Sequence, residues 1–327
     1  KFYLIKIHRE KKMDKIVSKD LCKTYYNKKE KKTALSNLNL NIKEGEIYCL
    51  LGLNGAGKTT FIKILGTALL PTSGDVFVDG ISVIKDPEYI RKCIAVIPQD
   101  VQPDYMLTPF DYAYYFQLLR GRTRKEAKKY AEVALKIVDL WEYRNKLCGL
   151  LSGGEKRRAI ISSALASNAE VMVLDEPTSG LDAVSKRKIW ACLRNIAQSG
   201  KTILITTHNM EEAEIISDRI GIINNGMAIH EGSLEEIKNI IPYKYRVIVS
   251  KKFESEKNIG NILDKIDEND DSIVNIGDKS TKYFINENDA IEFLKNCLDN
   301  KYPANISNIV LEDIFIKIIG KVEEDNV

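Results

Sequence analysis

Short apolar runs alternate with longer amphipathic stretches over the first two thirds of the chain. Apolar runs rich in β-branched residues predict strands, and segments with apolar residues three and four apart predict helices. Alternation of the two predicts an α/β fold in which helices cover a sheet. The run Val171–Leu174 is apolar throughout, which indicates a strand buried on both faces. The predicted strands are Ile47–Leu51, Val76–Val78, Ile94–Ile97, Val171–Leu174, Thr202–Thr206 and Ile220–Ile223.

Between residues 103 and 150 no strand pattern occurs, and we expect a helical insertion in the α/β domain. Thr108 and Pro109 are typical of a helix start, and Asp111 follows three residues after the cap. A further helix is predicted over Arg124–Leu140. If the first helix begins after Thr108, four large side chains share one face, which we expect to be buried in the insertion. They are Tyr112, Tyr115, Phe116 and Leu119.

The pattern changes again near Pro242, which predicts a second domain. Before it, Asn224-Asn225-Gly226 predicts a hairpin and Ser233 a helix cap. After it, the predicted order is a strand at 243–249, a helix at 256–266, strands near 272–285, a helix at 289–298 and a last helix from Glu312. The predicted organisation is an N-terminal extension over 1–13, an α/β domain over 14–240 that includes the insertion at 103–150, and a small α+β domain over 243–327.

Charge and cysteine content narrow the class of protein. The 49 basic and 46 acidic residues leave a net charge of +3, which gives no reason to expect a nucleic-acid partner. Basic residues are concentrated in residues 1–32, where we expect solvated lysines, with an anionic membrane surface as the alternative. The six cysteines form no C-x-x-C pair, which favours a reducing compartment. No apolar run approaches the roughly 18 residues that span a bilayer, so we expect a soluble intracellular protein.

A glycine-rich loop at 52–59, Gly-Leu-Asn-Gly-Ala-Gly-Lys-Thr, lies between a predicted strand and a helical segment. Its glycines leave backbone N–H groups free to turn toward phosphate oxygens. Lys58 can then supply charge to the β- and γ-phosphates, and Thr59 can offer a hydroxyl to Mg²⁺. A helix that begins at the loop adds its positive end to the phosphate site. The sequence therefore predicts a nucleoside triphosphate site.

Two adjacent carboxylates, Asp175 and Glu176, end the buried strand at 171–174. By itself such a pair is ordinarily a solvated loop. After a buried strand, in a chain with a phosphate loop, we expect Asp175 to hold Mg²⁺ and Glu176 to orient and deprotonate water.

Together with other motifs in order, these segments resemble the nucleotide-binding subunits of ABC transporters over about residues 14–237. The resemblance implies a P-loop NTPase fold of the ABC type, with ATP and Mg²⁺ as cofactors. The matching segments are Tyr25 (or Tyr26) as the adenine-stacking aromatic, the Walker A loop at 52–60, Gln99 in the Q-loop, the signature motif Leu151–Glu155, Walker B at Val171–Glu176, the D-loop Ser179–Asp182 and the switch histidine His208.

The resemblance also implies a role for each matching residue. In the family two domains pack head to tail, so that each ATP lies between one phosphate loop and the partner's signature motif. The implied ATP contacts are Tyr25, Gly52, Asn54, Gly55, Ala56, Gly57, Lys58, Thr59 and Thr60, with Ser152, Gly153, Gly154 and Asp182 contacting the partner's ATP. The implied catalytic residues are Glu176, Lys58, His208 and Gln99, and the implied Mg²⁺ ligands are Thr59, Gln99 and Asp175.

The segment Leu311–Gly320 and Trp190 are similar to features of drug-export ATPases of the daunorubicin-resistance type. That resemblance implies an ATP-hydrolysing motor subunit, peripheral on the cytoplasmic face of the membrane. It implies pairing with a second cassette, in a homodimer or a heterodimer, and with a separate ABC-2-type permease. A soluble ABC ATPase in cofactor assembly or another non-transport role is the alternative. We also expect Tyr105 and Met106 to line a permease-binding groove.

The three basic residues that follow the signature motif are Lys156, Arg157 and Arg158. We expect at least one of them to form a structural ion pair with an acidic residue, because basic residues on a helix face are usually solvated or paired.

Overall fold

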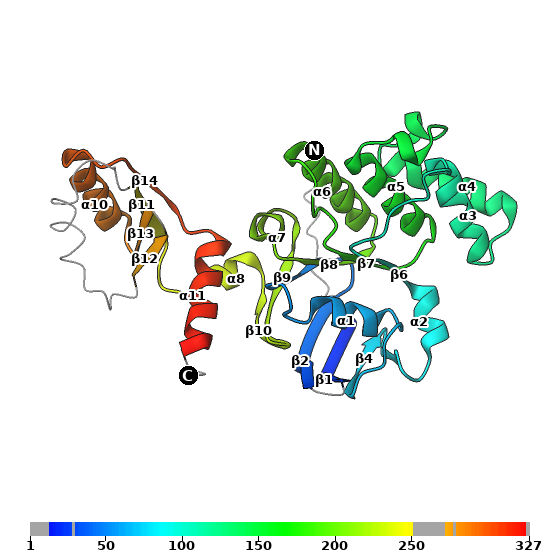
Figure 1. The fold of residues 1–327 in the computed structure, drawn as a ribbon, viewed down its shortest axis with the longest axis horizontal. Helices are drawn as coiled ribbons and strands as arrows, with labels where there is room; N and C mark the ends of the chain where they lie inside the picture. Colours follow the sequence, from blue (N-terminus) through cyan, green and yellow to red (C-terminus); the bar gives the residue numbers. More distant parts are fainter. Residues whose placement is uncertain (1–12, 28–29, 251–271, 277–278, 325–327) are drawn as a thin grey trace, which may run out of the picture. The chain divides into compact units, whose positions relative to one another are not determined.

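A computed structural model of the chain describes residues 13–27, 30–250, 272–276 and 279–324, in two units that divide after Leu234 (Figure 1). The structure divides the chain a few residues before the boundary predicted near Pro242. Residues 1–12 of the expected N-terminal extension and the helix predicted at 256–266 lie outside the described residues.

The first unit is built on a six-stranded sheet. Its order is β10 (Met227–Gly232), β9 (Arg219–Asn224), β3 (Ile47–Leu51), β8 (Thr202–Thr207), β7 (Val171–Asp175) and β6 (Ile94–Ile97). Neighbouring strands run parallel except β10, which the hairpin at 224–226 turns back along β9. Successive residues of β7 enter opposite cores, Val171 and Val173 on one side and Met172 and Leu174 on the other. The prediction of a strand buried on both faces is therefore confirmed.

One face of this sheet packs against α1 (Lys58–Leu65) and a second, antiparallel sheet. That sheet has the order β2 (Glu30–Lys43), β1 (Asp14–Asn27), β4 (Ser73–Val78) and β5 (Ile81–Ser82). The long β1–β2 pair was not predicted, because several register shifts interrupt its alternation of apolar and polar residues. Helix α2 (Pro87–Cys93) leads into β6.

The other face is covered by α5 (Gly153–Ala166), α6 (Ala183–Gln198) and α7 (Met210–Ile216). The helices expected between 103 and 150 are α3 (Pro109–Leu119) and α4 (Arg124–Ile137), with short 3₁₀ turns at Trp141–Tyr143 and Cys148–Leu150. Thr108 and Asp111 form the predicted capping box at the start of α3.

The predicted buried face of α3 is wrong for Tyr115 and Leu119, whereas Tyr112 is half-buried against the core. The buried positions of α3 are Pro109, Ala113 and Gln117, whereas Leu119 is 86% exposed and Tyr115 48% exposed. Alanines from α3, α4 and α5 meet in one cluster of buried side chains. Because small residues let helices approach closely, the alanine face of α3 is buried, and Tyr115 and Leu119 are left at the surface.

The second unit is α+β, as expected. Its sheet has the order β12 (Ile273–Ile276), β13 (Lys279–Phe284), β11 (Tyr245–Ser250) and β14 (Ala304–Asn308), with every pair antiparallel. Helix α10 (Glu287–Asp299) packs on one face of it. Arg246 and Tyr283 of the sheet both donate hydrogen bonds to Asp313 of α11 (Leu311–Glu324). The short helix α8 (Leu234–Lys238) lies at the division between the units, and β14 was not predicted.

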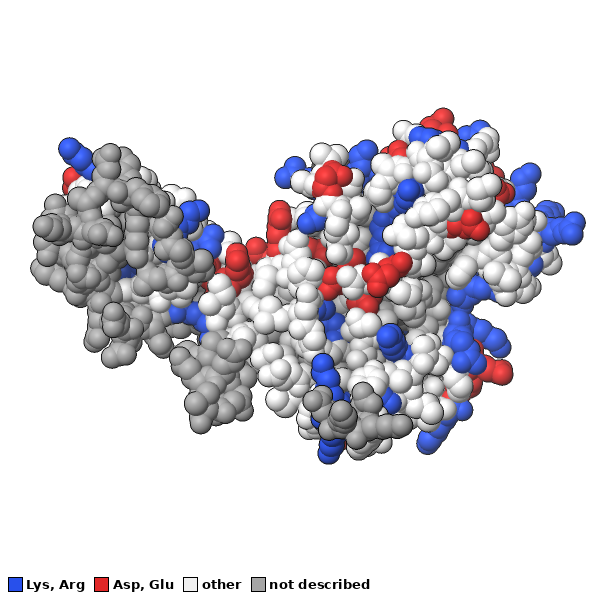
Figure 2. Space-filling view, viewed as in Figure 1, with Lys and Arg blue, Asp and Glu red and all other residues white. Residues whose placement is uncertain are grey.

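Charged side chains of both signs lie over the face of the first unit shown in Figure 2, with uncharged surface between them. Within the described ranges, no helix has the length and apolar character needed to cross a bilayer.

Candidate nucleotide site

Parallel pairing of β3, β8, β7 and β6 brings the carboxyl ends of four strands to one edge of the sheet. In open α/β sheets this edge is where ligands bind. The register sets Leu51 beside Thr207 and Asp175 beside Thr206. Residues that follow each strand therefore meet there although they are distant in sequence: the loop 52–57 after β3, His208 after β8, Glu176 after β7 and Gln99 after β6.

The phosphate loop turns tightly into α1. Gly57, the residue before the helix, has φ of 110°, and a Cβ atom there would lie 2.5 Å from the carbonyl oxygen of Ala34. Only glycine satisfies both constraints. Lys58 Nζ donates to the carbonyl oxygens of Gly52 and Leu53 at 2.7 and 3.1 Å. Burial lowers the pKa of Lys58, and the carboxylates of Glu176 and Asp175 act in the opposite direction.

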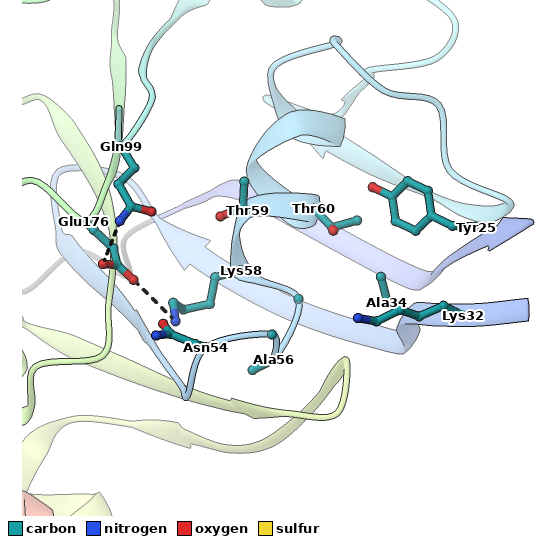
Figure 3. Close-up of a pocket in the computed structure, with 12 residues that line it drawn as sticks. Tyr25, Lys32, Ala34, Asn54, Ala56, Lys58, Thr59, Thr60, Gln99 and Glu176 are labelled. Atoms are coloured by element: carbon teal, nitrogen blue, oxygen red, sulfur yellow. Dashed lines mark hydrogen bonds and ion pairs between the residues drawn. The ribbon is translucent and has the colours of Figure 1, made fainter. Parts of the chain in front are cut away.

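A cavity of about 440 Å³ opens beside this loop (Figure 3). Tyr25 lies at one end of it and Gln99 with Glu176 at the other. Ten of its lining residues were singled out from sequence: Tyr25, Asn54, Gly55, Ala56, Gly57, Lys58, Thr59, Thr60, Gln99 and Glu176. Of the remaining predicted ATP, metal and catalytic residues, Gly52, Asp175 and His208 lie behind or beside the lining rather than in it.

Two lining residues, Lys32 and Ala34, were missed by sequence reasoning. Lys32 is paired with Tyr25 across the β1–β2 hairpin, so both side chains lie on the same face. Recognition of that hairpin would have assigned Lys32 to the site together with Tyr25.

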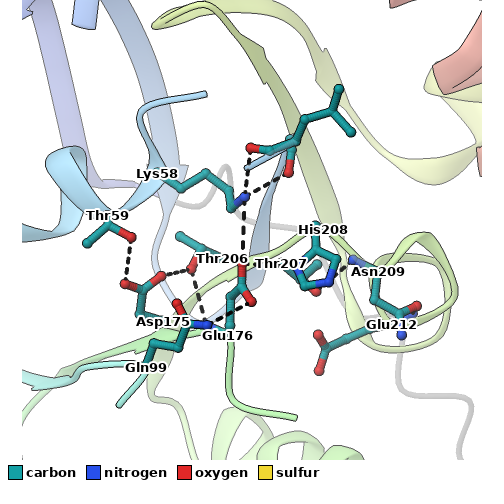
Figure 4. Close-up of polar contacts among 12 residues, drawn as sticks. Lys58, Thr59, Gln99, Asp175, Glu176, Thr206, Thr207, His208, Asn209 and Glu212 are labelled. Atoms are coloured by element: carbon teal, nitrogen blue, oxygen red, sulfur yellow. Dashed lines mark hydrogen bonds and ion pairs between the residues drawn. The ribbon is translucent and has the colours of Figure 1, made fainter. Parts of the chain in front are cut away.

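Asp175 joins two hydroxyl groups at the bottom of the site (Figure 4). Thr59 Oγ1 donates to one carboxylate oxygen at 2.9 Å, and the hydroxyl of Thr206 donates to the other. The described residues contain no group of three or more His, Cys, Asp or Glu side chains that could hold a metal. The hydroxyl of Thr59 and the carboxylate of Asp175 are oxygen donors that fit Mg²⁺, which usually binds through one or two protein oxygens together with substrate phosphates and water.

Glu176 is the meeting point of the catalytic candidates. Its carboxylate lies 3.0 Å from His208 Nδ1 and 3.7 Å from Lys58 Nζ, and it accepts a hydrogen bond from Gln99 Nε2 at 3.3 Å. Its backbone has φ of 45°, a left-handed conformation that costs roughly 1–3 kcal/mol in a residue with a side chain. Glu176 N–H donates to the Thr206 carbonyl oxygen at 3.0 Å, which holds this turn against β8.

The residues expected to act on a partner's nucleotide lie together, outside the cavity. Ser152 caps α5 through a capping box with Glu155, and Asp182 caps α6. A Cβ atom on Gly154 would lie 2.6 Å from the Ser185 hydroxyl, so the two helix starts pack too closely for a side chain there. Hydrogen bonds from Ser185 lower the pKa of Asp182. Ser152, Gly153 and Asp182 are exposed, and two adjacent helix N-termini suit an anion.

The ion pair expected at the start of α5 is not present among the described residues. Arg157 is buried and donates to backbone carbonyls, and Lys156 Nζ lies 5.0 Å from the centre of the Tyr105 ring. Arg158 is also buried, and its Nε has no hydrogen-bond acceptor among the described residues.

The strand–loop–helix phosphate site and its Walker B carboxylates define a P-loop NTPase. Comparison with known proteins narrows the class. Residues 35–179 match the family described as "ABC transporter". The solved ATP-binding cassette MJ0796, described as a dimeric post-hydrolysis state bound to ADP and Pi, is 31% identical. It covers 67% of this chain, the chain covers 98% of it, and the TM-score is 0.61. The structure of cbiO1 from Clostridium perfringens, described as part of the ABC transporter complex cbiONQ, is 28% identical over 69% of this chain and 91% of that structure, with a TM-score of 0.62.

Curated proteins with similar sequences are also ABC-type proteins. ABC transporter A family member 5 of Arabidopsis thaliana is 30% identical over 90% of this chain and 32% of its own length. Human phospholipid-transporting ATPase ABCA3 is 39% identical over 64% of this chain and 12% of its own length. The chain belongs to the ABC transporter ATP-binding family and contains an ABC-type ATPase domain that binds ATP. It spans about a third or less of the length of these curated relatives.

The adenine-stacking residue can be tested directly, because sequence alone left Tyr25 and Tyr26 as alternatives. Tyr25 lines the cavity, whereas Tyr26 is 73% exposed and does not. Loss of one base-stacking ring costs about 1–3 kcal/mol. Tyr25→Ala should therefore weaken ATP binding about tenfold or more, measured by titration calorimetry. Tyr26→Ala is the matched control and should bind ATP as the wild type does; the reverse result would transfer the role to Tyr26.

Proposed function

We propose that this chain is the ATP-hydrolysing motor of an ABC membrane transporter and works as a head-to-tail pair of cassettes. The observation that carries the proposal is the convergence of Lys58, Gln99 and His208 on the Glu176 carboxylate at the edge of the nucleotide cavity. A cassette that only binds nucleotide would not need a buried carboxylate next to the γ-phosphate position.

The chain's own residues divide the chemistry among them. Lys58 and the N–H groups of the phosphate loop bind the β- and γ-phosphates, while Tyr25 stacks on the base. Thr59 and Asp175, with Gln99 as a further ligand, would hold Mg²⁺, which would supply positive charge to the phosphate oxygens. Glu176 Oε1, which His208 Nδ1 contacts at 3.0 Å, accepts a proton from the attacking water.

His208 donates a hydrogen bond to the transferred phosphoryl group once nucleotide is bound, since its side chain is 48% exposed at the site's margin. The partner cassette completes the binding site for the γ-phosphate. Ser152, Gly153, Gly154 and Asp182 of the second chain approach it with the N-termini of two helices. Dimers are described for MJ0796, and the exposed position of Ser152 and Asp182 supports the same arrangement here.

We assign the membrane-spanning part to an ABC-2-type permease outside the present sequence, with this chain peripheral on the cytoplasmic face. Similarity to the Arabidopsis thaliana A family member covers 90% of the chain and so includes part of the second unit.

The first test concerns the general base. Glu176→Gln keeps the shape of the side chain but cannot accept the proton from water. We expect ATP binding to persist, steady phosphate release to fall at least about a hundredfold, and an ATP-bound dimer to accumulate in size-exclusion chromatography. Turnover near the wild-type rate would exclude Glu176 as the base.

The second test concerns the shared site. Lys58→Ala disables the phosphate loop of one chain, and Ser152→Arg blocks the slot that faces the partner's ATP. Each homodimer should be inactive. In a mixed dimer, both substitutions lie at the same nucleotide site, and the second site contains an unchanged phosphate loop and an unchanged signature motif. Mixing the two variants should therefore restore measurable ATPase activity. Failure to restore activity, with mixing shown by affinity-tag pull-down, would contradict a site shared between two copies of this chain.

The third test concerns the permease. Tyr105 is 55% exposed and Met106 78% exposed, and they lie in the chain between Gln99 and the start of α3. Exposed aromatic and methionine side chains favour protein interfaces. Tyr105→Ala combined with Met106→Ala should reduce recovery of the chain with membranes while its ATPase activity in solution stays within about twofold of wild type. Undiminished recovery with membranes would show that Tyr105 and Met106 do not form the contact with the permease.

A further inference from the structure

Arg157 lies in the second turn of α5, five residues after the exposed Ser152 cap, yet its side chain points away from solvent. The residue is 8% exposed. Its guanidinium makes five hydrogen bonds, all to backbone carbonyl oxygens. No acidic side chain in the described part of the chain forms a salt bridge with it. A buried cation satisfied by carbonyl oxygens alone is uncommon, since buried charges are ordinarily paired.

The five acceptors belong to only two loops. Nη1 donates to the carbonyl oxygens of Pro98 and Gln99 at 3.4 and 3.3 Å. Nη2 donates to those of Asp175 and Glu176 at 3.1 and 3.4 Å, and Nε donates to that of Pro177 at 2.9 Å. One planar group therefore joins the loop after β6 to the loop after β7.

These two loops carry the side chains that meet in the nucleotide cavity. Gln99 Nε2 donates to Glu176 Oε2 (Figure 4), while the backbone carbonyl oxygens of both residues accept hydrogen bonds from Arg157. Glu176 also has the left-handed φ of 45°, which directs its carboxylate and its carbonyl to different partners. The rigid fork of an arginine fixes such acceptors in one geometry, which a lysine ammonium cannot do.

We propose that Arg157 is a positioning residue that locks Gln99 and Glu176 in their catalytic arrangement and couples them to the signature helix of the same chain. The inference rests on the proposed ATPase function. Since α5 begins at the surface that meets the partner's ATP, a shift of that helix moves Arg157 and, through it, both loops of the chain's own site.

The test compares Arg157→Lys with Arg120→Lys. Arg120 is a matched control because it also donates to two backbone carbonyls, those of Arg91 and Lys92, and also connects the helical insertion to the α/β domain. It does not line the cavity or contact either catalytic loop. We expect Arg157→Lys to keep the wild-type Kd for ATP, measured by calorimetry, and to lower kcat about a hundredfold, since displacement of catalytic groups by about 1 Å costs that much. Arg120→Lys should keep both values.

The value of kcat is calculated per chain that binds ATP, so that unfolded protein in a sample does not lower it. A second measurement uses Glu176→Gln as background. If Arg157 acts through Glu176, adding Arg157→Lys to Glu176→Gln should lower the residual rate by less than threefold, rather than by the full factor seen alone.

Wild-type kcat in Arg157→Lys, a loss of ATP affinity that matches the loss of kcat, an equal loss of kcat in Arg120→Lys, or full additivity with Glu176→Gln would each overturn the assignment. Failure of the proposed function is a separate outcome, because it would appear as absence of ATPase activity in the wild-type chain.

Discussion

The register of β7 against β8 is the constraint on which the rest of the site depends. Pairing of Asp175 with Thr206 sets the hydroxyl of one strand against the carboxylate of the next, and the adjacent pairing of Leu51 with Thr207 starts the phosphate loop at the same level. A slip of one residue would turn Asp175 toward the opposite face of the sheet and separate it from Thr59. Packing on both faces of β7 opposes such a slip, because Val171 and Val173 would exchange cores with Met172 and Leu174.

A second consequence of this register is that Glu176 begins the first turn after the strand. Its left-handed backbone is unfavourable by itself, and the hydrogen bond from its N–H to Thr206 holds the turn in place. The side chains of Gln99, His208 and Lys58 contact the carboxylate of Glu176. Arg157 donates a hydrogen bond to the backbone carbonyl oxygen of the same residue. The side chain and the backbone of this proposed catalytic residue are thus both held by protein groups, which is the preorganisation that catalysis by positioned groups requires.

Much of this arrangement could be predicted from sequence, because short motifs encode local backbone geometry. The glycines and Lys58 define the phosphate loop wherever it occurs, and an apolar run ending in Asp175-Glu176 identifies a buried strand and its functional end. Features that depend on tertiary packing could not be read in this way. Lys32 enters the site only through the β1–β2 pair, whose register shifts obscure the strand pattern. The α3 face was misassigned because close alanine packing, not side-chain size, decides which positions are buried.

In the proposed mechanism, hydrolysis requires two copies of the cassette around each nucleotide. The most direct test of this requirement is the rate of phosphate release per chain as the concentration of the purified chain is raised at saturating ATP and Mg²⁺. We expect the rate per chain to rise with protein concentration from near zero to a plateau as dimers form. The midpoint should equal the dimer dissociation constant measured by light scattering. A rate per chain that stays constant down to concentrations at which the protein is monomeric would contradict the proposed mechanism.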